Sequence, residues 1–299
     1  MDEWVSKEEA HIIKGLIVGK KYKMTETKPA DGYVTAESIE FTVENTKEVQ
    51  KHQMLDDVTK VEISKKDITD SSEVPGAKLI ILDKDGKKVE SWTSTDKPHM
   101  VEKLPVGEYT LREEQAPDGY LIAEDVKFTV KDTGKVQKVK MKDAHPYGKL
   151  VIKKTDSTSK AALSGAEFEL REKESGKVVE KLVTDKTGTA TSGKIPIATY
   201  KNGKVEKTVE YILVETKAPN GYELSSKKEE IRFEYKDGKT KVIEIVKEIK
   251  NTKSPSGSTP TGNSPKTGDS TNIWLPILLA FLSACGIGGV IWYKKKKEN

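Results

Sequence analysis

Apolar and polar residues alternate in short runs along most of the chain. Examples are VEISK from Val61, KLVIK from Lys149 and YILVE from Tyr211. Asp-Gly, Asn-Gly and Thr-Gly pairs separate such runs and are typical of tight turns between strands. Within this alternating region no segment sustains the 3.6-residue period of a helix. The pattern therefore predicts an all-β chain of tandem sandwiches built from short strands.

The chain repeats itself at a domain-sized interval. Trp4 matches Trp92 and Gly19 matches Gly107, both at an offset of 88 residues. A third and looser copy ends its own Gly-Tyr pair at Tyr222. In every copy a glutamate precedes that tyrosine by seven residues, in the pairs Glu26–Tyr33, Glu113–Tyr120 and Glu215–Tyr222. Self-similarity of this kind indicates tandem domains.

The edges of the copies predict an incomplete domain over residues 1–59, complete domains over 60–145 and 146–253, and a Pro/Gly/Ser/Thr linker over 254–272. The last copy carries an insertion near residues 191–208. The first copy lacks the equivalent of residues 61–90, and residues 1–20 hold no apolar segment of a signal peptide. We therefore expect the native chain to begin upstream of Met1.

A run of 21 residues without charge occupies residues 273–293, and a basic tail follows over residues 294–299. The run is long enough to cross a bilayer as one transmembrane helix, with Trp274 and Trp292 suited to its two interfaces. Lysines that follow a span stay in the cytoplasm, so the rest of the chain is expected outside the cell.

Composition narrows the chemistry of the region before this span. Hydrophobic residues make up 34% of the chain and charged residues 33%, and the formal charge of +4 is matched by the four lysines of the tail. With this balance nothing in the composition marks a nucleic-acid binder, and we expect no nucleic-acid partner. The single cysteine, Cys285, lies in the apolar run, and the four histidines are scattered. We expect no disulfide, no metal site and no cofactor.

Ionisable side chains continue the apolar faces of several predicted strands. In the second domain, Val61 and Ile63 share a strand face with Lys65, and Tyr109 and Leu111 share one with Glu113. Val139 and Met141 share a third face with Asp143. The matching positions are Lys154, Glu215 and Asn251 in the third domain, and Glu26 and Asp56 in the first. A lone charge there usually marks a strand that emerges into water. Recurrence at matched positions favours a buried group, with the neighbouring Lys66 and Lys153 on the outer face.

Two motifs around these residues resemble a known family. Lys-x-Asp occurs at Lys65 and Lys154, and Tyr-x-Leu-x-Glu-x-x-Ala-Pro-x-Gly-Tyr begins at Tyr109. Together they are similar to the CnaB-type (SpaA-like) domains of Gram-positive adhesins and pilins, which are Ig-like or prealbumin-like sandwiches. The first copy departs locally, with Lys28-Pro29-Ala30 in the turn.

The resemblance implies a spontaneous isopeptide bond in each complete domain. Carried over residue by residue, it implies Lys65–Asp143 assisted by Glu113, and Lys154–Asn251 assisted by Glu215. Glu26 and Asp56 belong to the first domain, whose lysine would lie upstream. Each bond forms once and needs no cofactor, so the protein is expected not to be an enzyme.

Physical chemistry supports such a reaction independently of the family. Burial disfavours charge, which lowers the pKa of a lysine and raises that of a carboxylic acid. A neutral amine can then attack the carboxyl or amide carbon as a nucleophile, while a protonated glutamate assists the leaving group. Folding supplies the high effective concentration of the reactants. Asp143 would lose water, and Asn251 would lose ammonia.

A short motif precedes the apolar run and consists of Ser264, Pro265, Lys266, Thr267 and Gly268. Pro-x-Thr-Gly, an apolar span and a basic tail in this order resemble the sorting signal of Gram-positive wall proteins. The resemblance implies that a sortase cleaves after Thr267 and joins the chain to peptidoglycan, so that the membrane stage is transient. Ser264 stands where the family has leucine, which leaves the class of sortase open.

These features together predict the wall-anchored stalk of a secreted Gram-positive surface protein. Our first hypothesis is an adhesin, whose partners would be sortase, peptidoglycan and a host extracellular protein or other surface ligand. The alternatives are a pilin subunit polymerised by sortase and the wall anchor of an enzyme domain upstream.

Overall fold

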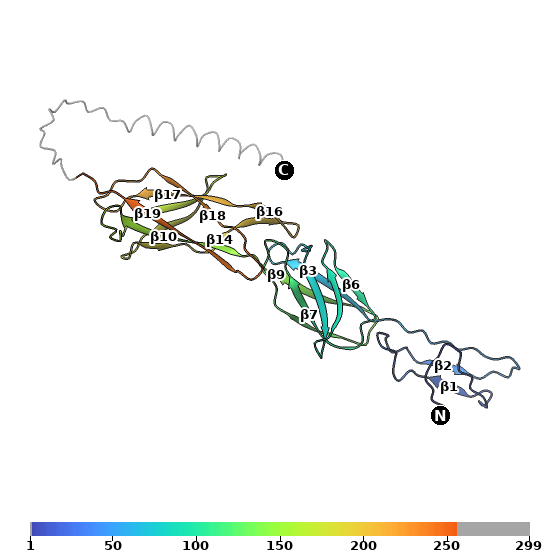
Figure 1. Cartoon of the computed structure of the whole chain (residues 1–299). Helices are drawn as coiled ribbons and strands as arrows, with labels where there is room; N and C mark the ends of the chain where they lie inside the picture. The colour runs from blue at the N-terminus through green and yellow to red at the C-terminus, as the bar shows by residue number, and fades with distance from the viewer. Residues whose placement is uncertain (1, 256–299) are drawn as a thin grey trace, which may run out of the picture. The chain divides into compact units, whose positions relative to one another are not determined.

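The computed structural model describes residues 2–255, and every regular element in this part of the chain is a β-strand (Figure 1). The all-β class predicted from the alternating pattern is therefore confirmed for these residues. The strands fall into three modules in chain order. The first module holds only the antiparallel pair β1 (Lys21–Met24) and β2 (Ile39–Thr42).

The second module is a sandwich of two sheets. Its strands are β3 (Lys60–Asp67), β4 (Lys78–Asp83), β5 (Lys88–Thr93), β6 (His99–Glu102), β7 (Gly107–Gln115), β8 (Val126–Val130) and β9 (Val136–Asp143). One sheet has the order β6-β3-β9, and the other has the order β5-β4-β7-β8. All neighbours are antiparallel except β3 and β9, which are the first and last strands of the module and run parallel.

The third module repeats this plan with additions. Its strands are β10 (Tyr147–Asp156), β11 (Glu167–Glu172), β12 (Val178–Val183), β13 (Thr189–Thr191), β14 (Ile195–Pro196), β15 (Ala198–Lys201), β16 (Lys204–Thr208), β17 (Glu210–Lys217), β18 (Lys228–Arg232) and β19 (Val242–Asn251). The first and last strands, β10 and β19, are again parallel neighbours, and the second sheet has the order β12-β11-β17-β18. The insertion near residues 191–208 forms the separate hairpin β15–β16.

Each complete module buries its own apolar core between its two sheets. Ile63, Leu111 and Met141 lie in the core of the second module, and Leu150 and Phe168 lie in that of the third. None of the buried apolar side chains in residues 2–255 belongs to the first module. A two-strand ribbon without a core is only marginally stable, which sets the first module apart from the other two.

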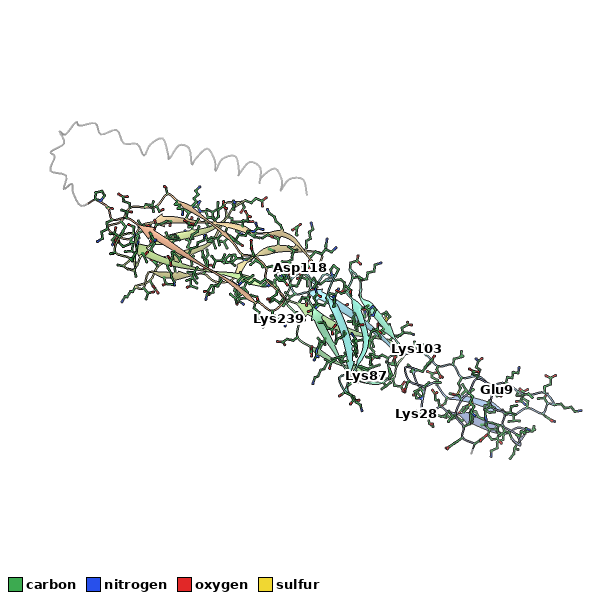
Figure 2. All side chains as sticks on the ribbon, in the orientation of Figure 1. Glu9, Lys28, Lys87, Lys103, Asp118 and Lys239 are labelled. Carbon is green, nitrogen blue, oxygen red and sulfur yellow. The ribbon has the colours of Figure 1, made fainter. Side chains whose placement is uncertain are left out.

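Charged side chains are exposed in the connections between strands. Figure 2 labels Lys87, between β4 and β5, and Lys239, between β18 and β19, and both are exposed. Among residues 2–255 no helix is long and apolar enough to span a membrane. The predicted transmembrane segment over residues 273–293, the basic tail and the motif at residues 264–268 lie outside the described residues.

A glycine in β10 allows the core of the third module to close. An added Cβ at Gly148 would lie 2.5 Å from the ring of Phe233, which is fully buried and cannot move aside. We expect Gly148→Ala to lower the free energy of unfolding by about 1–3 kcal/mol through overpacking. Gly193→Ala is the matched control, because its Cβ would lie 3.8 Å from its nearest neighbours, the Glu180 carboxylate oxygens. Equal denaturation midpoints of the two variants would contradict this account.

Candidate functional site

The parallel pairing of first and last strands sets the position of each lysine and its acid or amide. In the second module Lys65 lies opposite Met141, and Asp67 lies opposite Asp143. In the third module Lys154 likewise lies opposite Ile249, and Asn251 lies opposite Asp156. Side chains two residues apart share a face of a strand. Each lysine therefore points into the core beside the last residue of the neighbouring strand.

The glutamates come from the opposite sheet of each sandwich. Glu113 lies on β7 beside Leu79 of β4, and Glu215 lies on β17 beside Phe168 of β11. Both side chains are almost completely buried and face the lysine across the core. The structure thus brings together the three predicted residues of each complete module.

In the second module the lysine contacts both acids. Lys65 Nζ donates a hydrogen bond to Asp143 Oδ1 and lies 3.0 Å from Glu113 Oε2. The side chain of Lys65 is 2% exposed, and those of Glu113 and Asp143 are 0% exposed. The backbone N–H of Ala123 donates to Glu113 Oε2 at 2.7 Å and fixes the orientation of that carboxyl group.

The surroundings of Asp143 favour its neutral form. Burial raises the pKa of Asp143 from 3.8 to about 7, and Glu113 adds to this effect while Lys65 opposes it. Glu113 Oε1 and Asp143 Oδ2 have no hydrogen-bond partner among the described residues. An unpaired oxygen inside a core is costly for an ionised carboxylate, which acts in the same direction as the raised pKa of Asp143.

In the third module the amide of Asn251 is held at both ends. Its Oδ1 accepts a hydrogen bond from Lys154 Nζ, and its Nδ2 donates to both Glu215 oxygens at 3.0 Å and to the Glu223 carbonyl at 3.0 Å. Glu215 Oε1 also lies 2.9 Å from Lys154 Nζ. Glu215 therefore contacts both the lysine amine and the amide nitrogen of Asn251.

Burial also acts on the lysine of the third module. It lowers the pKa of Lys154, against the opposing effect of Glu215. The ring of Phe168 lies 5.6 Å from Lys154 Nζ and forms part of the apolar wall around the amine. Ser225 N–H donates to Glu215 Oε2 at 2.9 Å, in the role that Ala123 has in the second module.

The first module shows part of the same arrangement. Glu26 Oε2 accepts a hydrogen bond of 2.7 Å from Ala36 N–H, at the ten-residue spacing found for Glu113 and Glu215. Asp56, however, is exposed, and no hydrogen bond or ion pair joins it to Glu26 in the described part of the chain. The structure therefore does not assemble the predicted pair in this module.

The lysines that are adjacent in sequence to Lys65 and Lys154 lie outside the two buried sites. Lys66 pairs with Glu73 at 2.8 Å, and Lys153 is exposed. Among residues 2–255 no group of three or more His, Cys, Asp or Glu side chains could hold a metal ion. The predicted motif Ser264–Gly268 lies outside the described residues.

A second buried polar contact was not predicted from the sequence. Tyr120 of the Gly-Tyr pair donates its hydroxyl to Asp67 at 2.7 Å, and Tyr222 donates to Asp156 at 2.8 Å. Burial alone would raise the pKa of Asp67, but hydrogen bonds from Thr69, Tyr120 and His145 outweigh it and lower the pKa to about 2. The aspartate of Lys-x-Asp and the tyrosine of Gly-Tyr recur in both complete modules, and this recurrence was the signal for their contact.

The solved structures that resemble this chain include a likeness over most of its length and weaker ones. The TIE protein of Bacillus anthracis is 29% identical with a TM-score of 0.51, over 78% of this chain and 42% of that one. The present chain thus spans less than half of that relative. BcpA, the major pilin subunit of Bacillus cereus, is 16% identical with a TM-score of 0.27, over 66% of this chain and 99% of BcpA. No curated protein matches the chain.

Comparison with protein families covers most of the sequence. The SpaA prealbumin-like fold domain matches residues 1–57, 59–145 and 148–249, which is well over half of the chain. The match extends to the first module as well as to the two complete sandwiches. The chain therefore belongs to the SpaA family of prealbumin-like domains.

Proposed function

We propose that this chain is the self-crosslinked stalk of a Gram-positive surface protein. The observation that carries the proposal is the contact of a buried lysine amine with a side-chain carbonyl in both complete modules. A glutamate within 3.0 Å of each amine supplies a proton acceptor in the same dry site. Because the reactants are residues of one folded chain, each bond forms once and the protein is not a turnover catalyst.

In the second module the proposed reaction is a condensation that releases water. Lys65 Nζ first passes a proton to Glu113 and becomes a neutral amine. The amine attacks Cγ of Asp143, whose raised pKa leaves about half of this group in the reactive acid form near pH 7. The Nζ–Cγ bond forms, the Cγ–Oδ bond breaks, and the hydroxyl leaves as water with one proton from the amine. Glu113 gives the proton it holds to the leaving oxygen and takes a second proton from the amine nitrogen, so it ends protonated.

In the third module the same steps release ammonia. Lys154 Nζ attacks Cγ of Asn251, and the Cγ–Nδ2 bond breaks. The departing nitrogen takes one proton of the amine through Glu215, which lies 2.9 Å from Nζ and 3.0 Å from Nδ2. The amide oxygen already accepts a hydrogen bond from Lys154, so attack requires little movement of either side chain.

The proposed bonds would join the first strand of each module directly to the last. They close loops of 78 and 97 residues. If a crosslink limits the unfolded chain as a disulfide does, each contributes on the order of 4–5 kcal/mol to stability. Tension applied along the chain would pass from one strand to its covalent neighbour without separating the sheet between them. A stalk under shear outside a cell requires this property.

Attachment to the wall is proposed from the sequence alone. A sortase would cleave between Thr267 and Gly268 and transfer the new carboxyl end to an amine of peptidoglycan. The run over residues 273–293 would hold the chain in the membrane until that step. The stalk would belong to an adhesin, and a ladder of high-mass species in wall extracts would instead identify a polymerised pilin.

Crosslink formation can be tested by intact-mass spectrometry. We expect the mass of the chain to fall short of the sequence mass by one water and one ammonia. Lys65→Met should restore the water and Lys154→Met the ammonia, because each removes one nucleophile. The matched controls Lys66→Met and Lys153→Met carry the same change one residue away and should keep both losses. A wild-type chain of full sequence mass would contradict the proposal.

The pH dependence of stability tests the environment of Asp143. Its folded pKa of about 7 lies above the ordinary 3.8, so its contribution to stability is complete below pH 3.8 and is lost as the pH rises through 7. Lys65→Met cannot crosslink and lacks the lysine that opposes the rise in the Asp143 pKa, so we expect its free energy of unfolding to fall as the pH rises above about 4 and to keep falling beyond pH 7.

The double variant Lys65→Met/Asp143→Asn is the control for this experiment. Its amide cannot ionise, so the fall in stability with pH should be much smaller in denaturant titrations. Equal slopes in the single and double variants would show that Asp143 is not the group responsible.

A further inference from the structure

The insertion hairpin β15–β16 of the third module contacts the second module through Tyr200. The ring of Tyr200 stacks on His145, with 3.5 Å between centroids and 3° between planes, and meets Tyr120 edge-on at 5.3 Å. Its hydroxyl donates a hydrogen bond of 2.9 Å to the carbonyl of Gly119. One side chain of the insertion thus contacts both the Gly-Tyr loop of the second module and the short connection to β10.

Tyr120 lies at the centre of a small apolar cluster at this junction. Val74, Ala116 and Tyr120 are buried there, and Tyr200 of the hairpin packs against them. Tyr120 is 0% exposed, whereas its counterpart Tyr222 is only half-buried, although both donate to an aspartate in the same way. The hairpin supplies part of the cover of Tyr120 through the ring of Tyr200.

Three glycines mark close approaches between the two modules. An added Cβ would lie 1.9 Å from the carbonyl oxygen of Glu73 at Gly203, 2.2 Å from Val205 at Gly119, and 2.9 Å from Ile122 at Gly238. At each of these distances a neighbouring atom would have to shift, and at Gly203 that atom belongs to the backbone. Gly221 is the counterpart of Gly119 in the third module and has a similar φ of +81°, yet nothing lies within 4 Å of its Cβ position. The tight fit therefore belongs to the junction and not to the Gly-Tyr motif itself.

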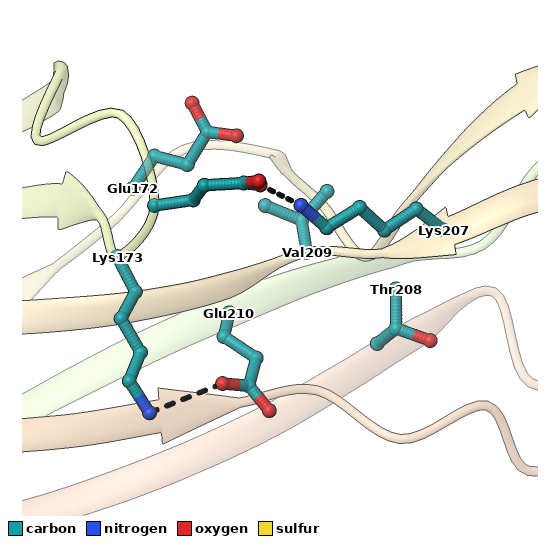
Figure 3. Close-up of a pocket in the computed structure, with 7 residues that line it drawn as sticks. Glu172, Lys173, Lys207, Thr208, Val209 and Glu210 are labelled. Carbon is teal, nitrogen blue, oxygen red and sulfur yellow. Dashed lines mark hydrogen bonds and ion pairs between the residues drawn. The ribbon is translucent and has the colours of Figure 1, made fainter.

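The hairpin is also fixed to the body of its own module. Val209 N–H donates to the Ile197 carbonyl at 3.0 Å at the base of the hairpin. Figure 3 shows Lys207 of β16 paired with a glutamate of the β11–β12 turn, which is Glu174. A hairpin held at its base and packed at its tip can transmit force between the two bodies that it contacts.

Hydrogen bonds from outside the hairpin complete the junction. Ile122 N–H of the second module donates to the Gly238 carbonyl of the third at 2.8 Å. The hydroxyl of Tyr235 donates to the Tyr120 carbonyl at 3.1 Å. Linked domains move relative to each other by default unless their interface is well packed. Here the hairpin and these bonds oppose that motion.

We propose that hairpin β15–β16 is a clamp that locks the second and third modules into one stiff unit. The hairpin docks onto one surface of the neighbouring module in the same chain. This surface consists of the loop of Gly119 and Tyr120 together with His145. The clamp acts between modules, whereas the proposed isopeptide bonds act within them. Either can be lost without the other.

Double electron–electron resonance on the full chain tests the clamp. Spin labels at Lys87→Cys and Lys186→Cys, both at exposed positions, report the distance between the modules, with Cys285→Ser in the background. We expect a single narrow distance distribution. Gly203→Ala and Gly119→Ala should broaden this distribution, because their new methyl groups collide with the other module.

Two substitutions provide matched controls for backbone strain. Gly176 has a φ of +69°, like the +68° of Gly203, and Gly221 has +81°, like the +88° of Gly119, but neither control position has an atom within 4 Å. Gly176→Ala and Gly221→Ala should therefore keep the narrow distribution. Broadening in these controls equal to that in Gly203→Ala and Gly119→Ala would overturn the proposal.

Tyr200→Ala tests the clamp without straining the backbone, so it remains informative if the glycine variants fail to fold. We expect it to broaden the distance distribution and to speed hydrogen exchange at the Ile122 amide, while exchange at core amides such as Ile152 is unchanged. A wild-type distribution as broad as that of Tyr200→Ala, or a Tyr200→Ala distribution as narrow as the wild type, would refute the clamp.

Discussion

The parallel pairing of the first and last strands is the constraint on which each complete module depends. It places chain positions 78 and 97 residues apart side by side and sets Lys65 and Lys154 next to Asp143 and Asn251. The same pairing buries the lysine between two sheets, where a charged amine is unfavourable unless it has partners. The glutamate of the opposite sheet supplies one partner, and the side-chain carbonyl supplies the other.

Part of this site could be predicted from the sequence. Period-two alternation was enough to place Lys65 on the inner face and Lys66 on the outer face, because that inference needs only the geometry of a single strand. The parallel register that sets Lys65 opposite Met141, two residues before Asp143, could not be derived in this way, since it depends on a contact between the two ends of the module. The Ala123 and Ser225 amides that orient the glutamates were also missed, because any backbone N–H looks the same in sequence.

The insertion illustrates the same limit at a larger scale. Its position near residues 191–208 followed from the repeat alignment, but its role followed only from contacts with Gly119, Tyr120 and His145. The two complete modules would thus be strengthened at two levels, by a covalent bond inside each and by an aromatic clamp between them. Among the described residues the first module has no buried apolar side chain and leaves Asp56 exposed, so the lysine–acid site is not assembled there.

Peptide mapping by tandem mass spectrometry is the most direct test of the central claim. After proteolysis of the folded wild-type chain, the account predicts two branched peptides, one joining Lys65 to Asp143 and one joining Lys154 to Asn251. Fragment ions should locate each linkage at the lysine Nζ and the side-chain Cγ. Recovery of these four residues only in separate linear peptides would contradict the account.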